Sequence, residues 1–126
     1  MKVLTLKQPW ATLISEGLKE YEFRSWNTNY RGKLLIHAGQ SIDKDESKKY
    51  DYIYPKSRIV ALVEIIDCIK IDDEFNKMIK NKNSIVYGSK DRVGYAWKIK
   101  LIKKINDNKE IKGKLGLWNL EDYDII

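Results

Sequence analysis

Residues 59–71 read IVALVEIIDCIKI and give the strongest strand signal in the chain. Apolar side chains, many of them β-branched, fill positions of both parities in this run, so a strand here would have two apolar faces. Strands of that kind lie in the centre of a sheet, where both faces are covered. The sequence therefore predicts a central strand over residues 59–71 and a mainly β core around it.

Shorter strand and helix patterns flank this run on both sides. The strand patterns cover residues 3–6, 19–26, 33–38 and 94–105. A short helix is expected to open at Pro9 and to end at Gly17, and Asp72 is placed to cap a second helix that runs to about residue 80. Residues 81–93 are interpreted as a mobile loop.

These elements predict one domain over residues 1–126, of the α+β class and mainly β. Short strands in this number, with two or three short helices, are typical of a small mixed β-barrel flanked by helices. An open antiparallel sheet with its helices on one face is the alternative.

Charge favours a polyanionic partner without deciding it. The chain has 24 Lys and Arg against 18 Asp and Glu, a net charge of +6. This fits RNA or a nucleotide, because lysines and arginines that neutralise phosphates supply affinity. However, the charge forms no basic block, and compositional drift in the coding sequence would also enrich Lys, Asn and Ile.

Several classes of protein are disfavoured by the sequence. No apolar run approaches the ~20 residues that cross a bilayer, and MKVLTLKQPW has no stretch long enough for a signal peptide. One His and one Cys leave too few ligands for a zinc site. We therefore expect a cytoplasmic monomer that binds no membrane, no metal and no cofactor.

The strand pattern at residues 19–26 carries charges that need water or partners. Glu22, Arg24 and Trp26 share one face, and buried charges cost several kcal/mol unless they are paired. We expect this face to line a water-filled cleft, with Lys19 at the rim. Glu64 interrupts the central strand and is expected in the cleft floor, paired with Lys19 or Arg24. The alternative is a carboxylate that meets water at the end of the sheet.

Two segments together carry a family resemblance. QPW at residues 8–10 and GLKEYEFR at 17–24, followed by Trp26, Arg31-Gly32 and IHA at 36–38, resemble the ASCH domain, a branch of the PUA-like fold. YAW at 95–97 and GLW at 116–118 are also similar to that family. The resemblance implies a PUA-like β-barrel with flanking helices and a cleft that uses Lys19, Glu22 and Arg24. The family is proposed to bind RNA, and some similar members hydrolyse acylated cytidine or cut RNA.

RNA or nucleotide binding in an RNA-metabolism or translation setting is the favoured function. The expected ligand-binding residues are Lys7, Gln8, Trp10, Lys19, Glu22, Arg24, Trp26, Tyr30 and Arg31. Trp26 and Tyr30 are the stacking candidates, while His37 is expected to be structural.

A small metal-independent hydrolase is the alternative, acting on acylated cytidine or as a ribonuclease, with Lys19, Glu22 and Glu64 as its catalytic residues. The acyl-cytidine hydrolases that the chain resembles have a threonine three residues after the lysine, and here that position is Glu22. This departure weakens a direct transfer of their mechanism. A protein-interaction domain is the third hypothesis.

Overall fold

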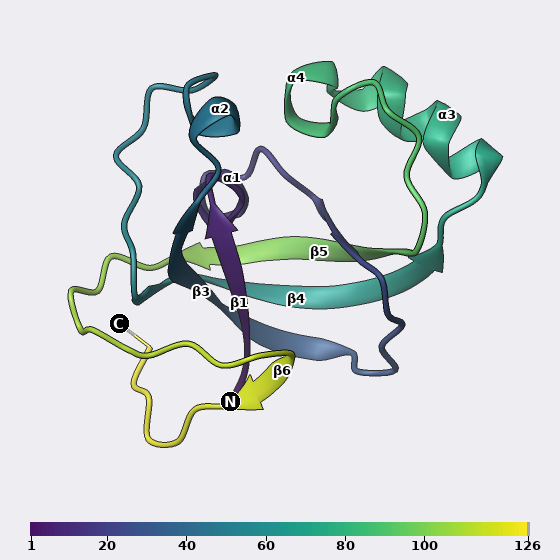
Figure 1. The fold of residues 1–126 in the computed structure, drawn as a ribbon. Coiled ribbons are helices and arrows are strands. Elements are labelled where there is room, and N and C mark those ends of the chain that lie inside the picture. The colour runs from purple at the N-terminus through teal and green to yellow at the C-terminus, as the bar shows by residue number, and fades with distance from the viewer. Residues whose placement is uncertain (126) are drawn as a thin grey trace.

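The computed structural model describes residues 1–125, and its centre is one mixed six-stranded sheet with the order β2-β5-β4-β3-β1-β6 (Figure 1). The strands are β1 (Lys2–Gln8), β2 (Tyr21–Arg24), β3 (Gly32–Ile42), β4 (Arg58–Lys70), β5 (Tyr95–Lys104) and β6 (Leu117–Asn119). The helices are α1 (Trp10–Ser15), α2 (Lys44–Ser47), α3 (Asp73–Lys82) and α4 (Ser84–Tyr87). Strands β1 and β3 are parallel, and the other neighbouring pairs are antiparallel.

The mainly β α+β class and the central strand are confirmed. β4 lies between β3 and β5, and Ile59, Ala61, Val63 and Ile65 along it have no exposed surface. Two apolar faces therefore place this strand in the middle, as the sequence predicted.

The backbone pairing does not form the closed barrel that was expected. β2 and β6 are the two edges of the sheet, and β1 hydrogen-bonds to β3 and β6 rather than to β2. Helix α1 packs against β1, β3, β4 and β5, and its residues Ala11 and Ile14 belong to the core of that face. The sheet is therefore open, and α1 covers part of the apolar face of its strands.

Three apolar clusters hold the layers together. One lies on the face under α1 and includes Leu4, Ile36 and Trp97. A second, with Val3, Leu35 and Trp118 among its members, lies on the opposite face of β1 and β3, and the C-terminal segment covers it. The third joins Tyr21 to α3 and α4, which Figure 1 shows together at one end of the sheet.

The segment after β4 is more ordered than predicted. Asp72 caps α3 as expected, since its Oδ1 accepts from the Phe75 N–H at 2.8 Å. The interpretation of residues 81–93 as a mobile loop is wrong, because they contain α4, whose Val86 and Tyr87 are buried. The apolar side of this helix was too short to show a period in the sequence.

Among the helices of residues 1–125, none is both long enough and apolar enough to span a membrane.

Candidate functional site

Lys19, Glu22 and Arg24 converge at the edge strand β2. The Glu22 carboxylate lies 3.6 Å from Lys19 Nζ through Oε1 and 3.7 Å from Arg24 Nη2 through Oε2. One carboxylate thus stands between two cations.

The alternation of β2 explains this placement. Tyr21 and Phe23 pack into the cluster formed with α3 and α4, as residues of one parity should. Glu22 and Arg24 have the other parity, and their register partners on β5 are Trp97 and Tyr95. The period-two pattern of the sequence is therefore confirmed in this strand.

Arg92 joins this group, although the sequence did not single it out. Its guanidinium carbon lies 4.1 Å from the Phe23 ring centroid, and Lys19 Nζ lies 4.5 Å from the same centroid. The Asn76 amide holds the backbone of Arg92 through hydrogen bonds of 2.9 and 3.0 Å. We call Lys19, Glu22, Arg24 and Arg92 the charged cluster.

Gly94 permits the close approach of this segment to β2. Gly94 has φ +97°, and a Cβ there would lie 2.6 Å from the Arg24 carbonyl oxygen. Only glycine lets the segment after Arg92 pass this close to β2. A glycine at the first position of a predicted strand could have indicated such a contact, but it does not identify the strand that is approached.

Lys19 is buried rather than at the rim of a cleft, which corrects the expectation. Its residue surface is 4% exposed, and its ammonium donates to the Tyr21 carbonyl. Burial lowers the pKa of Lys19 from 10.5 to about 8; Glu22 opposes this shift, and Arg92 and Arg24 add to it. Lys19 is a desolvated cation that supports the site from beneath.

The two arginines carry the cluster to the surface. Arg24 keeps a quarter of its side chain exposed and donates through Nη2 to the Thr5 carbonyl at 3.2 Å. Arg92 donates to the Tyr87 carbonyl at 2.8 Å, and burial lowers its pKa. The Nε atoms of both arginines are buried without a hydrogen-bond partner in the described part of the chain. Each guanidinium therefore retains unused donor capacity.

Glu64 lies on the other face of the sheet, so its predicted convergence with Lys19 or Arg24 is wrong. Its register partners are Lys33 and Lys100. Lys100 and Trp97 are three residues apart on β5, hence on opposite faces, and Glu22 is paired with Trp97. The alternative holds only in part: Glu64 is partly exposed to water, but it lies in the middle of β4 and not at the end of the sheet.

The QPW segment packs into the interior of the fold. Gln8 is fully buried; its amide donates to the Pro55 carbonyl at 2.7 Å and accepts from the Thr12 N–H at 2.9 Å. Both ends of this side chain are therefore engaged inside the protein. Trp10 is half-buried against the cluster of α3 and α4.

The turn after β2 holds three more of the expected ligand-binding residues. Trp26 is 36% exposed and stands edge-on to Trp97 at 4.7 Å. The Tyr30 hydroxyl donates to the Lys33 carbonyl at 2.5 Å, and Arg31 donates to the Thr28 and Tyr30 carbonyls. Trp26 is thus the aromatic residue of this turn with the most accessible ring.

The chemistry that this arrangement allows is anion binding. Two cations paired with one carboxylate, and a third cation close by at the Phe23 ring, leave an excess of positive charge. Two planar guanidinium groups can donate in pairs to phosphate oxygens. Within residues 1–125, no three His, Cys, Asp or Glu side chains are grouped as metal ligands.

Comparison with known proteins agrees with the motifs. The ASCH domain family model matches residues 4–113. Activating signal cointegrator 1 from Mus musculus and from Homo sapiens is 30% identical over an alignment of 81 residues. Each alignment covers 52% of this chain but only 14% of the relative, so the chain corresponds to a small part of those proteins. The family match spans most of the sequence, which confirms the resemblance: this chain belongs to the ASCH domain family.

Proposed function

We propose that this domain has an RNA-related role and binds single-stranded RNA or a nucleotide at the charged cluster. The observation that carries the proposal is the pairing of Lys19 and Arg24 with the single carboxylate of Glu22, with Arg92 beside Lys19 at the Phe23 ring. Membership of the ASCH family and the net charge of +6 support the same role.

Each member of the cluster has a distinct part in this proposal. Arg24 and Arg92 contact phosphate oxygens through the exposed part of their guanidinium groups. Lys19 adds positive potential from a buried position, where charge is poorly screened. Glu22 holds Lys19 and Arg24 in place, and the half-exposed ring of Trp26 stacks on a base.

The test is a comparison of RNA affinity between arginine variants. We expect Arg24→Gln and Arg92→Gln each to weaken binding of a single-stranded RNA of about ten nucleotides by roughly tenfold, because each loses charge-assisted phosphate contacts. The slope of log affinity against log salt should shrink by about 0.7 for each lost contact. Fluorescence anisotropy at several salt concentrations measures both quantities.

Arg58→Gln is the matched control, because Arg58 bonds to Lys56 and Asn108 and lies outside the cluster. It should leave the affinity within about twofold. Trp26→Ala should weaken binding with an unchanged salt slope, since stacking carries no counterion release. Equal losses in Arg58→Gln and Arg24→Gln would mean that net charge, and not this cluster, binds RNA.

A second candidate, hydrolysis of an acylated nucleoside or of RNA, rests on the ionisation of Lys19. A lysine whose pKa is lowered to about 8 beside a carboxylate at 3.6 Å is suited to proton transfer near neutral pH. If the domain is a hydrolase, the wild-type protein should release acetate from N4-acetylcytidine, or cut labelled RNA, at least 100-fold faster than Lys19→Met. Equal product formation by the two proteins, measured by chromatography, rejects this candidate.

A further inference from the structure

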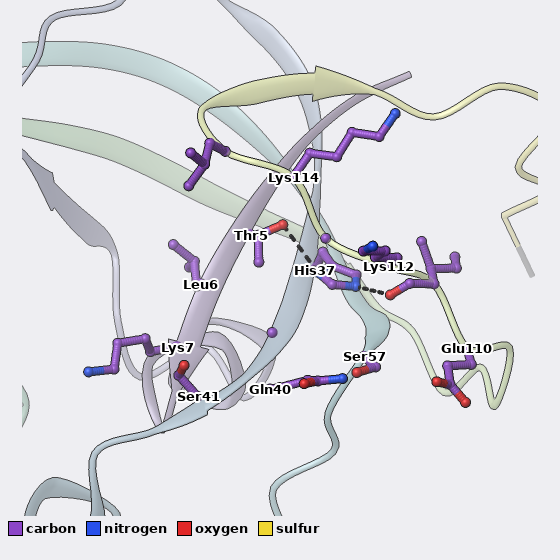
Figure 2. Close-up of a pocket in the computed structure, with 14 residues that line it drawn as sticks. Thr5, Leu6, Lys7, His37, Gln40, Ser41, Ser57, Glu110, Lys112 and Lys114 are labelled. Carbon is purple, nitrogen blue, oxygen red and sulfur yellow. Dashed lines mark hydrogen bonds between the residues drawn. The ribbon is translucent and has the colours of Figure 1, made fainter.

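A cavity of about 550 Å³ lies near the C-terminal ends of β1 and β3. None of its lining residues belongs to the charged cluster. Its lining comes from the ends of β1 and β3, from Ser57 before β4, and from residues 110–115, which we call the strap. Figure 2 shows Thr5 and His37 between Lys7 on one side and the strap on the other. Pockets of about 300–1,000 Å³ commonly hold small molecules.

One wall of this cavity is held by a chain of hydrogen bonds in which each donor and acceptor can be assigned. Trp118 Nε1 donates to Thr5 Oγ1 at 3.1 Å, the Thr5 hydroxyl lies 3.2 Å from His37 Nδ1, and His37 Nε2 lies 2.6 Å from the Ile111 carbonyl oxygen. A carbonyl can only accept, so Nε2 carries the proton and Nδ1 accepts from Thr5. Burial also lowers the pKa of His37, which favours this neutral form. His37 therefore holds the strap and is structural, as expected from the sequence.

Hydrogen bonding and close packing hold the strap against the wall of the cavity. The Ile111 N–H donates to the Ser57 carbonyl at 2.8 Å, and the Ile111 side chain is buried. At Gly113 the strap backbone is so close to the wall that a Cβ would lie 3.0 Å from His37 Cε1 and from Thr5 Cγ2. The hollow is thus pre-formed between rigid segments, which reduces the entropic cost of binding.

The side chains around the cavity give it a positive and partly apolar character. Lys7, Lys112 and Lys114 lie at its edge with one acid, Glu110, and none of the three lysines takes part in an ion pair within residues 1–125. The Leu115 side chain at the same edge is 98% exposed. Unpaired ammonium groups favour a phosphate, and an exposed leucine favours an organic body attached to it.

We propose that this cavity is a second binding site, separate from the charged cluster, and that it takes a phosphorylated organic molecule of about mononucleotide size. Lys112 and Lys114 belong to the strap and Lys7 to the opposite side of the cavity, and their flexible side chains can turn toward a phosphate bound between them. Hydroxyl and amide groups of Ser41, Ser57 and Gln40 line the polar part, and Leu115 covers the apolar part of the ligand.

Calorimetric titration of the whole chain with adenosine monophosphate, adenosine and inorganic phosphate tests this proposal. We expect adenosine monophosphate to bind with a Kd below about 1 mM and at least tenfold more tightly than either fragment, because both halves of the ligand contribute. Lys112→Gln with Lys114→Gln should weaken it at least tenfold. Leu115→Ser, at a position too exposed to affect folding, should weaken it several-fold.

Two matched controls decide which site is occupied. Lys77→Gln with Lys103→Gln removes the same charge from exposed positions outside the cavity and should leave the affinity unchanged. Arg24→Gln with Arg92→Gln should remove only the binding that occurs at the charged cluster, and the binding event that depends on Lys112 and Lys114 should persist. Absence of binding by the wild-type protein, or loss of binding in the arginine pair but not in the strap pair, overturns the proposal. The RNA titrations above remain valid in either case, so the two proposals can fail separately.

Discussion

Trp97→Ala is expected to lower the free energy of unfolding by about 4 kcal/mol, which is typical of truncating a large aromatic residue in a core. The indole has no exposed surface and belongs to the cluster under α1. It also contacts Trp26 edge-on at 4.7 Å and donates to the Trp26 carbonyl at 3.3 Å. Removing it leaves a void beneath Glu22, its register partner on β2.

Urea denaturation followed by circular dichroism measures this loss. Trp26→Ala is the companion variant, and at 36% exposure it should cost only about 1 kcal/mol. The two tryptophans are in contact, but Trp97 belongs to the core, whereas Trp26 is the residue proposed to stack on a base. Similar costs for both substitutions would show that Trp26 is part of the core, and its proposed stacking on a base would then lose its basis.

Raising the pH from about 7 to about 10 should stabilise the wild-type protein relative to Lys19→Met by about 2 to 3 kcal/mol. In the unfolded chain Lys19 keeps its proton up to a pKa of 10.5, whereas in the folded protein it keeps it only up to about 8. Between these two values the unfolded chain binds more protons, so stability rises with pH. Each unit of pKa difference corresponds to about 1.4 kcal/mol.

Using the difference between the two proteins cancels the titration of the other lysines and tyrosines. Methionine has a similar length and no charge, so the packing against Phe23 and Tyr87 is retained. Urea unfolding at several pH values between about 7 and 10 provides the curve. A difference that stays constant over this range would mean that Lys19 has an ordinary pKa, and the hydrolase candidate would lose its main support.

The local patterns of the sequence predicted the elements that carry the site. The two apolar faces of residues 59–71 gave the central strand β4, and alternation at residues 19–26 placed Glu22 and Arg24 on one side of β2. Asp72 indicated the start of α3. Such signals are local, because a strand's facing and a helix cap depend on a few neighbouring residues.

Arg92 shows what local patterns leave out. It lies about seventy positions after Glu22, and its place depends on the Asn76 hydrogen bonds and on the close passage allowed by Gly94. Glu64 is a second example of the same limit. It has the periodicity of a cleft residue, but the register across β2, β5 and β4 assigns it to the opposite face.

By itself, the sequence determined the family through its motifs, and it determined the mainly β class and the strand faces through residue spacing along the chain. The tertiary structure alone decided that the sheet stays open, that Lys19 is buried, and that a cavity forms behind the strap. These features depend on register and packing between distant segments. Side-chain periodicity says which way a residue faces in its own strand, but not which residue of another strand it will meet.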